Sequence, residues 1–488
     1  MNRIEQFSVI ADDLGNVLRF ISFGTCVPLI VALIYSEWNM IIPMALVPVI
    51  LYLMGTFFLM FPENKREAKL SQALFSVALI WLICAFVGAV PFWIGMGMPY
   101  LDAVFEAMSG WTDTGLTMIP DVDSTPYTLL FWRSFMQWLG GLGIVAFTVV
   151  MLSKTGLNPS RFYRSEGRSE AFMPSVVQQG FQMWKIYLIL TIISVLLILI
   201  SGVSLWDAVN IAMVAIATGG FSVHSAGISY YNSPLLEMLI IPVMIAGALP
   251  FKIYYLMYYK KKVSFFRDEQ AWLLFFLIIV GFLVISMDLL FLNGLDSATA
   301  IRQGIFMAVA GVTSTGFQIS SPDLWAPVTV LFLVMLMFIG GSSGSTAGGI
   351  KLSRAALVYR GIVWWFKRSF VSGKVIVPFR YAGKIIPKAE AEAEVSKNML
   401  IIILYLFVIF FSAILIMHFE SSSVDTSKVI FEIVSASCNN GISTGFATPD
   451  MTPFSKVVFI FAMWIGRLEI MAVIVFFMGL IKGFDKSI

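Results

Sequence analysis

Long apolar runs recur along this chain and constrain its fold more than any other feature. A membrane-spanning helix needs about 20 mostly apolar residues. Segments of this kind lie at 18–36, 40–61, 72–95, 127–152, 184–204, 234–258, 271–292, 326–341, 398–418 and 455–481. Of the 488 residues, 59% are hydrophobic and only 12% are charged, whereas soluble domains have about a quarter charged residues. We therefore expect an all-α polytopic membrane protein with about ten spans.

Four shorter stretches between these runs are weakly apolar and rich in Gly, Ser and Thr. They lie at 101–119, 206–224, 298–318 and 427–446. They are too short to cross a bilayer and too apolar for ordinary loops. Non-helical backbone is tolerated at membrane depth only where protein or a watery cavity surrounds it, so we interpret all four as re-entrant segments.

The basic residues are unevenly distributed and orient the chain. Lys and Arg gather in the loops at 62–71, 153–182 and 259–269, in the stretch 351–397 and at the C-terminal end. By the positive-inside rule these segments and both termini face the cytoplasm, and the four re-entrant segments then face outside. Within the long inner stretch, the basic segment 367–388 suits either anionic lipid headgroups or a cytosolic partner.

Acidic residues flank the re-entrant segments. They are Asp102, Asp121, Asp123, Asp207, Asp296, Asp323, Asp425 and Asp450. An acidic outer mouth attracts cations and repels anions. The alternative, favoured for any single aspartate, is that outer loops merely lack Lys and Arg because of topology.

Each re-entrant segment contains a polar turn that ends in glycine. The turns are Thr112-Asp113-Thr114-Gly115, Ala217-Thr218-Gly219-Gly220, Thr313-Ser314-Thr315-Gly316 and Cys438-Asn439-Asn440-Gly441. A single glycine turn in a membrane protein usually marks only a helix break. Four in equivalent places, all outside, indicate a fourfold repeat of helix, short helix, turn and helix.

The first and fourth repeats match most closely. Shifting residues 105–149 by 326 positions aligns them without a gap to 431–475 and gives eleven identities in 45 positions, against roughly three or four expected from residue frequencies. We therefore predict two N-terminal transmembrane helices at 1–70 and four pseudo-symmetric units around one central pore. The predicted units are 71–155, 156–262, 263–390 and 391–488.

Turns arranged around one axis can present backbone carbonyls to a shared ring. Such a ring replaces the hydration shell of a monovalent cation, and glycine is needed because other residues resist the required φ values. The two histidines and three scattered cysteines (Cys26, Cys84 and Cys438) suggest neither a metal centre nor a disulfide framework. We expect no covalently bound cofactor and no nucleic-acid partner.

The four glycine turns, together with the Met-Trp-Ile-Gly-Arg-Leu-Glu-Ile run at 463–470, resemble the Trk/Ktr/HKT superfamily of potassium transporters. The resemblance covers essentially the whole chain and is closest to the bacterial TrkH type, which has two additional N-terminal helices. It implies a pore within a single subunit, K⁺ as the transported ion, homodimers, and a cytosolic TrkA-type nucleotide-binding ring as regulatory partner. It also implies the bacterial cytoplasmic membrane as the location.

The segment after the eighth span is unusually small and polar. It contains Gly340, Gly341, Ser342, Ser343, Gly344, Ser345, Thr346, Ala347, Gly348 and Gly349. A phosphate-binding P-loop is excluded, because Lys351 comes one place late and is followed by Leu352. A flexible helix kink is one alternative. The resemblance implies an intramembrane loop, which we interpret as a mobile plug beneath the filter.

Arg467 interrupts the apolar final span at the position where the first repeat has Gly141. A buried arginine is costly and implies a functional site or a specific partner. A structural ion pair with Glu469 or Glu432 is one alternative. The resemblance places this arginine just below the filter, and we hypothesise that Arg467 and segment 340–349 form the gate.

Other polar residues receive simpler interpretations. Glu106 and Glu432 more plausibly brace the turns from behind than bind the ion. Asp113 stands where the resembled family commonly has threonine, so its carboxylate departs from the expected filter. His224 and His418 could sense protons, but single histidines near a membrane interface are usually just interfacial polar residues.

The sequence favours one of three candidate functions. Potassium uptake is favoured, since all four turns keep their glycine; in plant relatives of the resembled family, serine at the position of Gly115 accompanies sodium preference, so a sodium-permeable member is an alternative. A polytopic enzyme acting on lipid would need a convergent cluster of acids, histidines or nucleophiles, and the sequence suggests none. An inverted-repeat carrier would need two oppositely oriented halves, whereas these repeats share one orientation.

Overall fold

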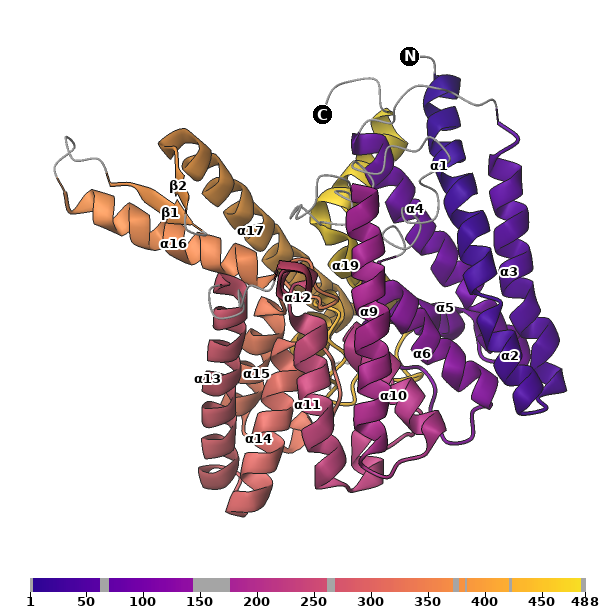
Figure 1. Ribbon diagram of the computed structural model, residues 1–488, viewed down its shortest axis with the longest axis horizontal. Helices are drawn as coiled ribbons and strands as arrows, with labels where there is room; N and C mark the ends of the chain where they lie inside the picture. Colours follow the sequence, from indigo (N-terminus) through magenta and orange to yellow (C-terminus); the bar gives the residue numbers. More distant parts are fainter. Residues whose placement is uncertain are drawn as a thin grey trace.

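The N-terminal helices stand together at one side of the molecule (Figure 1). The computed structural model describes residues 3–61, 70–143, 176–260, 268–371, 377–381, 384–420 and 424–483. Its first helices are α1 (Arg3–Gly24), α2 (Val27–Ile34) and α3 (Trp38–Phe58). The first span covers Phe7–Ile34. It begins earlier than predicted, because α1 continues through the polar residues Asp12 and Asp13.

The remaining helices follow the predicted order of long helix, short helix, turn and helix. Their bounds are α4 (Leu70–Gly88), α5 (Tyr100–Trp111) and α6 (Tyr127–Leu142); α9 (Val176–Leu199), α10 (Leu205–Ala217), α11 (Pro234–Ala248) and α12 (Phe251–Lys260); α13 (Glu269–Phe291), α14 (Ser297–Val312), α15 (Pro327–Ile339) and α16 (Leu352–Ser369); and α17 (Lys388–Phe419), α18 (Thr426–Ser437) and α19 (Pro453–Lys482). A π-helical turn, Pro91–Gly95, and two 3₁₀ turns, Gly227–Tyr231 and Pro322–Leu324, lie in the connections.

The four short helices α5, α10, α14 and α18 each begin one residue before the start predicted from the sequence. Side chains cap three of them. Ser204 accepts from the amide of Asp207, Asp296 from that of Thr299 and Asp425 from that of Ser427. Such caps satisfy amides that have no partner within the helix. Asp296 and Asp425, which were considered as part of an acidic mouth, therefore also have a structural role.

Seven helices among the described residues are long and apolar enough to cross a membrane, or eight if the bent pair α11–α12 is one span. This is fewer than predicted for two reasons. The expected span 326–341 contains only the 13 residues of α15, which ends at Gly340 where the small polar segment begins. In the expected span 127–152, α6 reaches Leu142, and residues 144–152 lie outside the described part.

The second long helix of each unit is interrupted. α6 ends at Gly143 (φ 88°), α15 at Gly340 (φ 68°), and α19 contains a non-helical residue, Glu469 (φ 62°, ψ 151°). α11 and α12 meet at an angle of 92°. Pro250 between them lacks an amide hydrogen and so cannot continue the ladder. The prediction of one continuous helix over 234–258 was therefore wrong.

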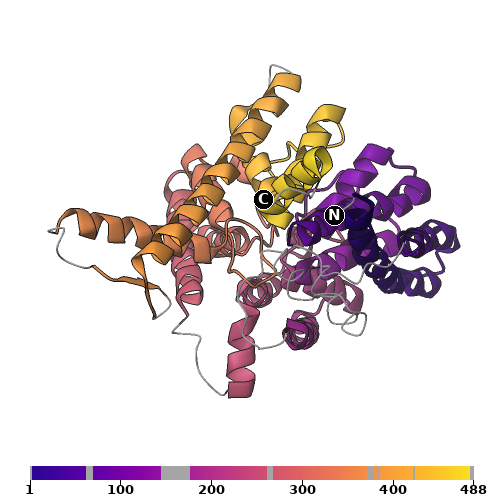
Figure 2. The ribbon, with the colours of Figure 1, turned by 90° about the horizontal axis from the view of Figure 1, so that it is seen from above.

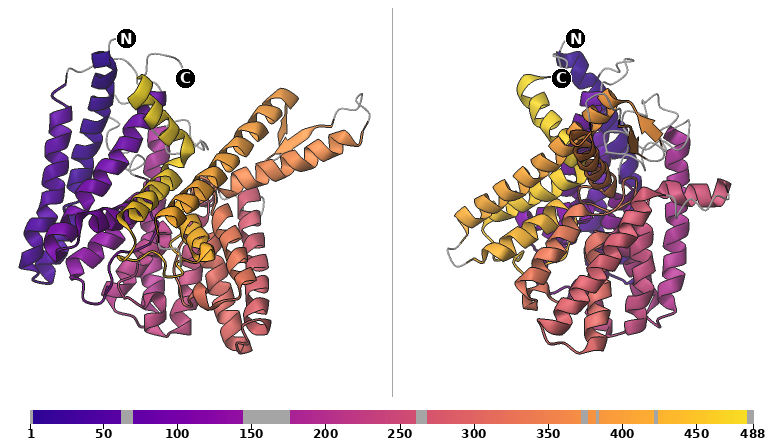
Figure 3. Two further views of the ribbon diagram at one scale, coloured as in Figure 1. Left: turned by 180° about the vertical axis from the view of Figure 1, so that it is seen from behind. Right: turned by 90° about the vertical axis from the view of Figure 1, so that its left-hand side faces the viewer.

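An arm projects from the bundle on the side where both termini lie (Figures 1 and 3). It consists of α16, strands β1 (Phe379–Tyr381) and β2 (Lys384–Ile386), and the start of α17. The strands pair antiparallel, so the all-helical prediction missed a small hairpin. The indole of Trp364 donates to the carbonyl of Val377 at 2.8 Å, and Trp364 packs on Phe379. Hydropathy alone treats α16 and the hairpin as one basic stretch and gives no sign that they contact each other.

Viewed from above, the helical groups surround a common centre in chain order (Figure 2). Buried apolar residues from all four units form one continuous core. Several basic residues that were used to orient the chain lie outside the described residues: Lys65, Arg66, Lys69, Lys154, Arg161, Arg164, Arg168, Lys261, Lys262, Arg267 and Lys486. The predicted unit boundaries at 155/156 and 262/263 also lie there.

Candidate functional site

The four predicted turns share one backbone conformation. The second residue of each turn is a non-glycine residue in the left-handed region, and these residues are Asp113 (φ 56°), Thr218 (φ 59°), Ser314 (φ 55°) and Asn439 (φ 48°). The glycine two positions later also has a positive φ, 94°, 85°, 75° and 96° in turn order. Left-handed non-glycine residues cost about 1–2 kcal/mol each. Finding the same costly conformation four times indicates that it is retained for a purpose.

The four glycines form a closed ring, named here the glycine ring. A Cβ on any one of them would collide with the carbonyl oxygen that precedes the next glycine. The Cβ of Gly115 would lie 2.5 Å from the oxygen of Gly219, that of Gly220 2.8 Å from Thr315, that of Gly316 1.9 Å from Asn440, and that of Gly441 2.2 Å from Thr114. The series returns to its first member, so the four turns surround one axis at near contact.

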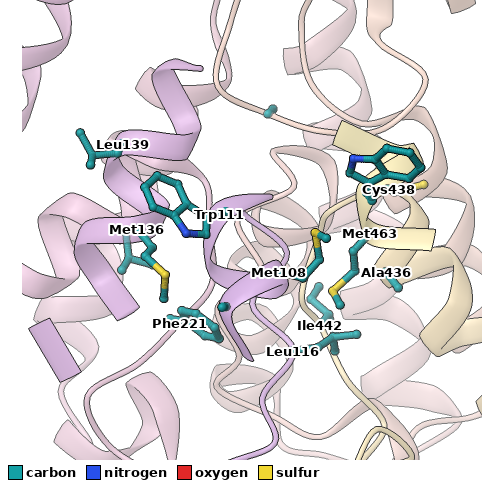
Figure 4. Packing of buried hydrophobic residues seen from close by; sticks show 14 of the residues in the cluster. Met108, Trp111, Leu116, Met136, Leu139, Phe221, Ala436, Cys438, Ile442 and Met463 are labelled. Carbon is teal, nitrogen blue, oxygen red and sulfur yellow. The ribbon is translucent and has the colours of Figure 1, made fainter. Parts of the chain in front are cut away.

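Side chains of the turns are buried and hold the backbone. Thr112 donates its hydroxyl to the carbonyl of Met108 at 2.7 Å, and Thr313 donates to Val309 at the same distance. The first and third turns therefore match at side-chain level. Apolar residues such as Met108, Leu116, Ile442 and Met463 gather around the turns (Figure 4). The turns are thus embedded in the core of the protein.

Polar contacts between the units fix the turns to one another. Asn439 donates to the hydroxyl of Thr114 at 3.0 Å, and Asn440 donates to the carbonyl of Gly311 at 2.9 Å. Above the glycine ring, the amide of Gln318 donates to the carbonyl of Ser443 and accepts from its amide. Hydrogen bonds between the units therefore hold the ring together in addition to packing.

Gln137 on α6 is a site residue that sequence reasoning missed. Its Nε2 donates to the carbonyl of Gly219, and its Oε1 accepts from the amide of Phe221 at 3.1 Å. The side chain is buried, so both groups depend on these bonds. A lone buried amide within an apolar span was the available signal, but its partner lies more than 80 residues away.

Glu106 and Glu432 contact the segments that follow the glycines, in agreement with the interpretation that they brace the turns. Glu106 accepts from the amide of Met118, and Glu432 accepts from that of Thr444, both at 2.7 Å. Glu106 also forms a buried ion pair with Arg133, at 2.7 Å. Arg133 was not singled out from the sequence, although a buried arginine is costly without a partner.

Segment 340–349, named here the glycine–serine loop, occupies the break between α11 and α12. The amide of Thr346 donates to the carbonyl of Gly247, and that of Ser342 to Ala248, both at 3.2 Å. In return, the carbonyl of Gly344 accepts from the amide of Phe251 at 3.1 Å. Each irregular segment thus satisfies backbone groups of the other, which is required at membrane depth.

The glycine–serine loop also reaches the turns. A Cβ on Gly348 would lie 2.0 Å from the carbonyl oxygen of Cys438, and the hydroxyl of Thr346 lies 3.3 Å from that of Thr218. Ser342 and Thr346 are buried. The predicted gate segment is therefore in direct contact with the second and fourth turns.

Arg467 connects the glycine–serine loop to the first turn. Its guanidinium donates to the carbonyl of Thr346 at 3.0 Å and to that of Gly141 at 3.0 Å, and it forms an ion pair with Asp113 at 3.1 Å. The partners considered from the sequence are engaged elsewhere. Glu469 pairs with Arg354 at 2.5 Å, and Glu432 braces the fourth turn.

A small cavity lies next to this arginine. It is lined by Trp81, Gly143, residues 343–346, Lys351 and residues 467–469. Its volume is about 40 Å³, which is room for roughly three water molecules. The cavity touches both Arg467 and the glycine–serine loop. Among the described residues, no group of three or more His, Cys, Asp or Glu side chains is placed to hold a metal ion.

Several of the outer acids have structural partners. Asp102 forms a buried ion pair with Lys456 at 2.5 Å, and Asp323 pairs with Lys428 at 2.6 Å. Asp123 is hydrogen-bonded to the His224 ring at 2.5 Å, and this hydrogen bond lowers the pKa of the Asp123 carboxyl. These partners give the three aspartates a structural role, as capping does for Asp296 and Asp425.

Together, the helices, the glycine ring and the loop against it define a class: a polytopic membrane protein in which four short helices end at one buried axis. The family model TrkH, described as a cation transport protein, matches residues 49–483. The chain belongs to the TrkH family of cation transport proteins.

Individual relatives cover nearly the whole chain. An uncharacterized cation transporter of Methanocaldococcus jannaschii is 32% identical over 466 residues, which are 95% of this chain and 94% of that protein. The Trk system potassium uptake protein TrkH of Halomonas elongata is 27% identical over 487 residues, covering 95% and 97%. The crystal structure of the potassium transporter TrkH from Vibrio parahaemolyticus matches with a TM-score of 0.83 at 26% identity, over 96% of this chain and 98% of that one.

Proposed function

We propose that this protein mediates potassium uptake across the cytoplasmic membrane, through the axis enclosed by the glycine ring. The closed order of contacts from Gly115 through Gly220 and Gly316 to Gly441 is the observation that carries the proposal. Relatives that cover nearly the whole chain are potassium uptake proteins by name. The family is one of cation transport proteins, which favours transport over an enzyme acting on lipid.

The four turns would act as a selectivity filter. Backbone carbonyls around one axis can replace the hydration shell of a potassium ion as it enters the protein. The turns present their carbonyls in one shared backbone conformation, because each has a left-handed residue two positions before its ring glycine. The hydroxyls of Thr112 and Thr313 donate to helix carbonyls, which holds these two side chains against the short helices.

The glycine–serine loop and Arg467 would form the gate. The loop contacts two of the turns, and Arg467 donates to the loop at Thr346. For the loop to move, its backbone hydrogen bonds to Gly247, Ala248 and Phe251 would have to break, and its small side chains would allow it to rearrange. Replacing Arg467 with alanine is expected to raise potassium flux or to remove its control. Unchanged flux and unchanged control at normal expression would exclude this role.

The surroundings of the protein form part of the same proposal. It would lie in a bacterial inner membrane with both termini cytoplasmic, and the four units would be 71–155, 156–262, 263–390 and 391–488. It would form homodimers and bind a cytosolic TrkA-type nucleotide-binding ring. The Trk system names of the relatives support a multicomponent assembly.

Uptake by vesicles containing the purified full-length protein tests the function. We expect uptake of potassium and rubidium in preference to sodium, measured with and without an imposed proton gradient. Dependence on that gradient would indicate coupled transport, and independence would indicate channel-like flux. Equal uptake of sodium would support the sodium-permeable alternative, and no uptake of any of the three cations would refute the proposal.

A further inference from the structure

The carboxylate of Asp113 is the one ionisable side chain among the four left-handed turn residues. The other three, Thr218, Ser314 and Asn439, are neutral. Asp113 is 1% exposed, and neither carboxylate oxygen accepts a hydrogen bond from any other described residue. Its recorded partner is the guanidinium of Arg467, at 3.1 Å. A buried carboxylate in this situation depends on a cation.

The space for this carboxylate is built into the neighbouring helix. A Cβ on Gly141 would lie 3.0 Å from the Asp113 carboxylate, so a larger residue at position 141 would crowd it. Arg467, which occupies the equivalent position of the fourth unit, supplies the positive charge from the unit next to the first around the axis. The site therefore combines the space left by Gly141 in the first unit with the guanidinium of Arg467 from the fourth unit.

Asp113 also lies at the junction of the proposed filter and gate. It is the second residue of the first turn, two residues before Gly115, while its partner Arg467 donates to Thr346 of the glycine–serine loop. Arg467 also lines the cavity of about 40 Å³, together with Lys351. When the loop moves, Arg467 loses one of its carbonyl acceptors.

We propose that Asp113 is a binding site for a monovalent cation directly below the glycine ring, which Arg467 occupies in this conformation and a potassium ion occupies when Arg467 withdraws. Removing the guanidinium without replacement would leave a buried carboxylate uncompensated. A permeating cation can take its place, so the arginine and the ion exchange at one carboxylate. The inference rests on the proposed potassium uptake and assigns one site within it.

The test compares two full-length variants that both lack the arginine. In Arg467→Gln, the Asp113 carboxylate is free to bind the ion, whereas in Asp113→Asn/Arg467→Gln it is absent. Rubidium uptake by vesicles is measured over a range of rubidium concentrations. We expect the half-saturating concentration to be about tenfold lower in Arg467→Gln than in the double variant, as a charge-assisted contact implies.

A second readout uses unfolding in detergent. Potassium chloride should raise the melting temperature of Arg467→Gln above its value in choline chloride, and it should not do so for the double variant. Glu392→Gln serves as control, since it removes a carboxylate paired with Arg368 on the exposed arm at 2.8 Å. It should leave both readouts at wild-type values.

The outcomes separate the two proposals. Equal half-saturating concentrations in the two variants would overturn the cation site, while uptake by both would leave the transport function standing. A failure of Arg467→Gln to fold even in potassium, when the double variant folds, would also overturn the site, because potassium is expected to replace the guanidinium. No rubidium uptake by the wild-type protein would refute the function itself.

Discussion

Gly140 and Gly466 occupy matching places in α6 and α19. A Cβ on Gly140 would lie 2.1 Å from the carbonyl oxygen of Trp111, and a Cβ on Gly466 would lie 2.1 Å from that of Ser437. Both carbonyls belong to the last residues of short helices. Gly466 lies 326 residues after Gly140, and Ser437 lies 326 residues after Trp111. The internal repeat is therefore reproduced in the way helices pack behind the turns.

Alanine at either glycine should destabilise the protein. The added methyl group would meet backbone, which cannot move aside as a side chain can, and overpacking of this kind costs about 1–3 kcal/mol. Denaturant unfolding in detergent measures the change. Gly110→Ala is the matched control, because its Cβ would meet the flexible end of Met136, and its free energy of unfolding should fall less than that of Gly140→Ala. Equal losses of unfolding free energy in Gly140→Ala and Gly110→Ala would show that the close contact with backbone does not determine the cost.

Replacing Gln137 with methionine should disturb the second turn. The change leaves the carbonyl of Gly219 and the amide of Phe221 without their side-chain partner, at a cost of about 1–3 kcal/mol for each unsatisfied group. We expect a lower rubidium uptake rate and weaker discrimination against sodium. Gln182→Met is the control, since this exposed-site amide only accepts from the hydroxyl of Tyr259. Wild-type discrimination in Gln137→Met would mean that the amide does not hold the turn.

Removing one member of the Asp102–Lys456 pair should be costly. Their side chains are 7% and 8% exposed, and breaking a buried pair leaves an uncompensated charge worth about 3–5 kcal/mol. Asp102→Asn should lower the free energy of unfolding by about that amount, whereas Asp102→Asn/Lys456→Met should recover most of it. Asp323→Asn, which breaks a half-exposed pair with Lys428, should change stability by less than about 1 kcal/mol.

The pair formed by Asp123 and His224 should add a pH-dependent contribution to stability. The hydrogen bond from His224 lowers the pKa of Asp123 below its ordinary value of 3.8, so the unfolded state binds a proton more readily than the folded state. The contribution is then present above pH 3.8 and disappears as pH falls through the lower folded pKa. Melting temperatures of the wild type and Asp123→Asn should differ near pH 5 and converge toward pH 3. A difference that persists or grows at pH 3 would contradict this.

Much of the fold follows from patterns that are local in the sequence. The short helices at Tyr100, Leu205, Ser297 and Thr426 begin one residue before their predicted starts, because the weakly apolar composition of each stretch marks them. The glycine of each turn could be identified because it ends a short polar turn within each re-entrant segment. Its positive φ follows from the same residue pattern, since glycine adopts that region without strain.

Features that depend on distant segments were not predictable in this way. The break at Pro250 occurs within an apolar run, and its backbone groups are satisfied by the glycine–serine loop about 100 residues later. Arg467 could be recognised as a costly buried charge, but its pairing with Asp113 arises only when the first and fourth units meet around the axis. Hydropathy records the environment of a residue and contains no information about which residue faces it.

The central claim is that the glycine ring selects the cation, and Gly115→Ser tests it most directly. Competition of sodium against rubidium uptake is measured in vesicles containing the wild type, Gly115→Ser or Gly97→Ser. Gly97 is the control, because it too has a positive φ, of 70°, but no atom within 4 Å of its Cβ position. We predict that sodium competes more effectively in Gly115→Ser alone, since the serine Cβ would meet the carbonyl of Gly219. A cation preference in Gly115→Ser identical to that of the wild type, at normal expression, would contradict the assignment of the glycine ring as the filter.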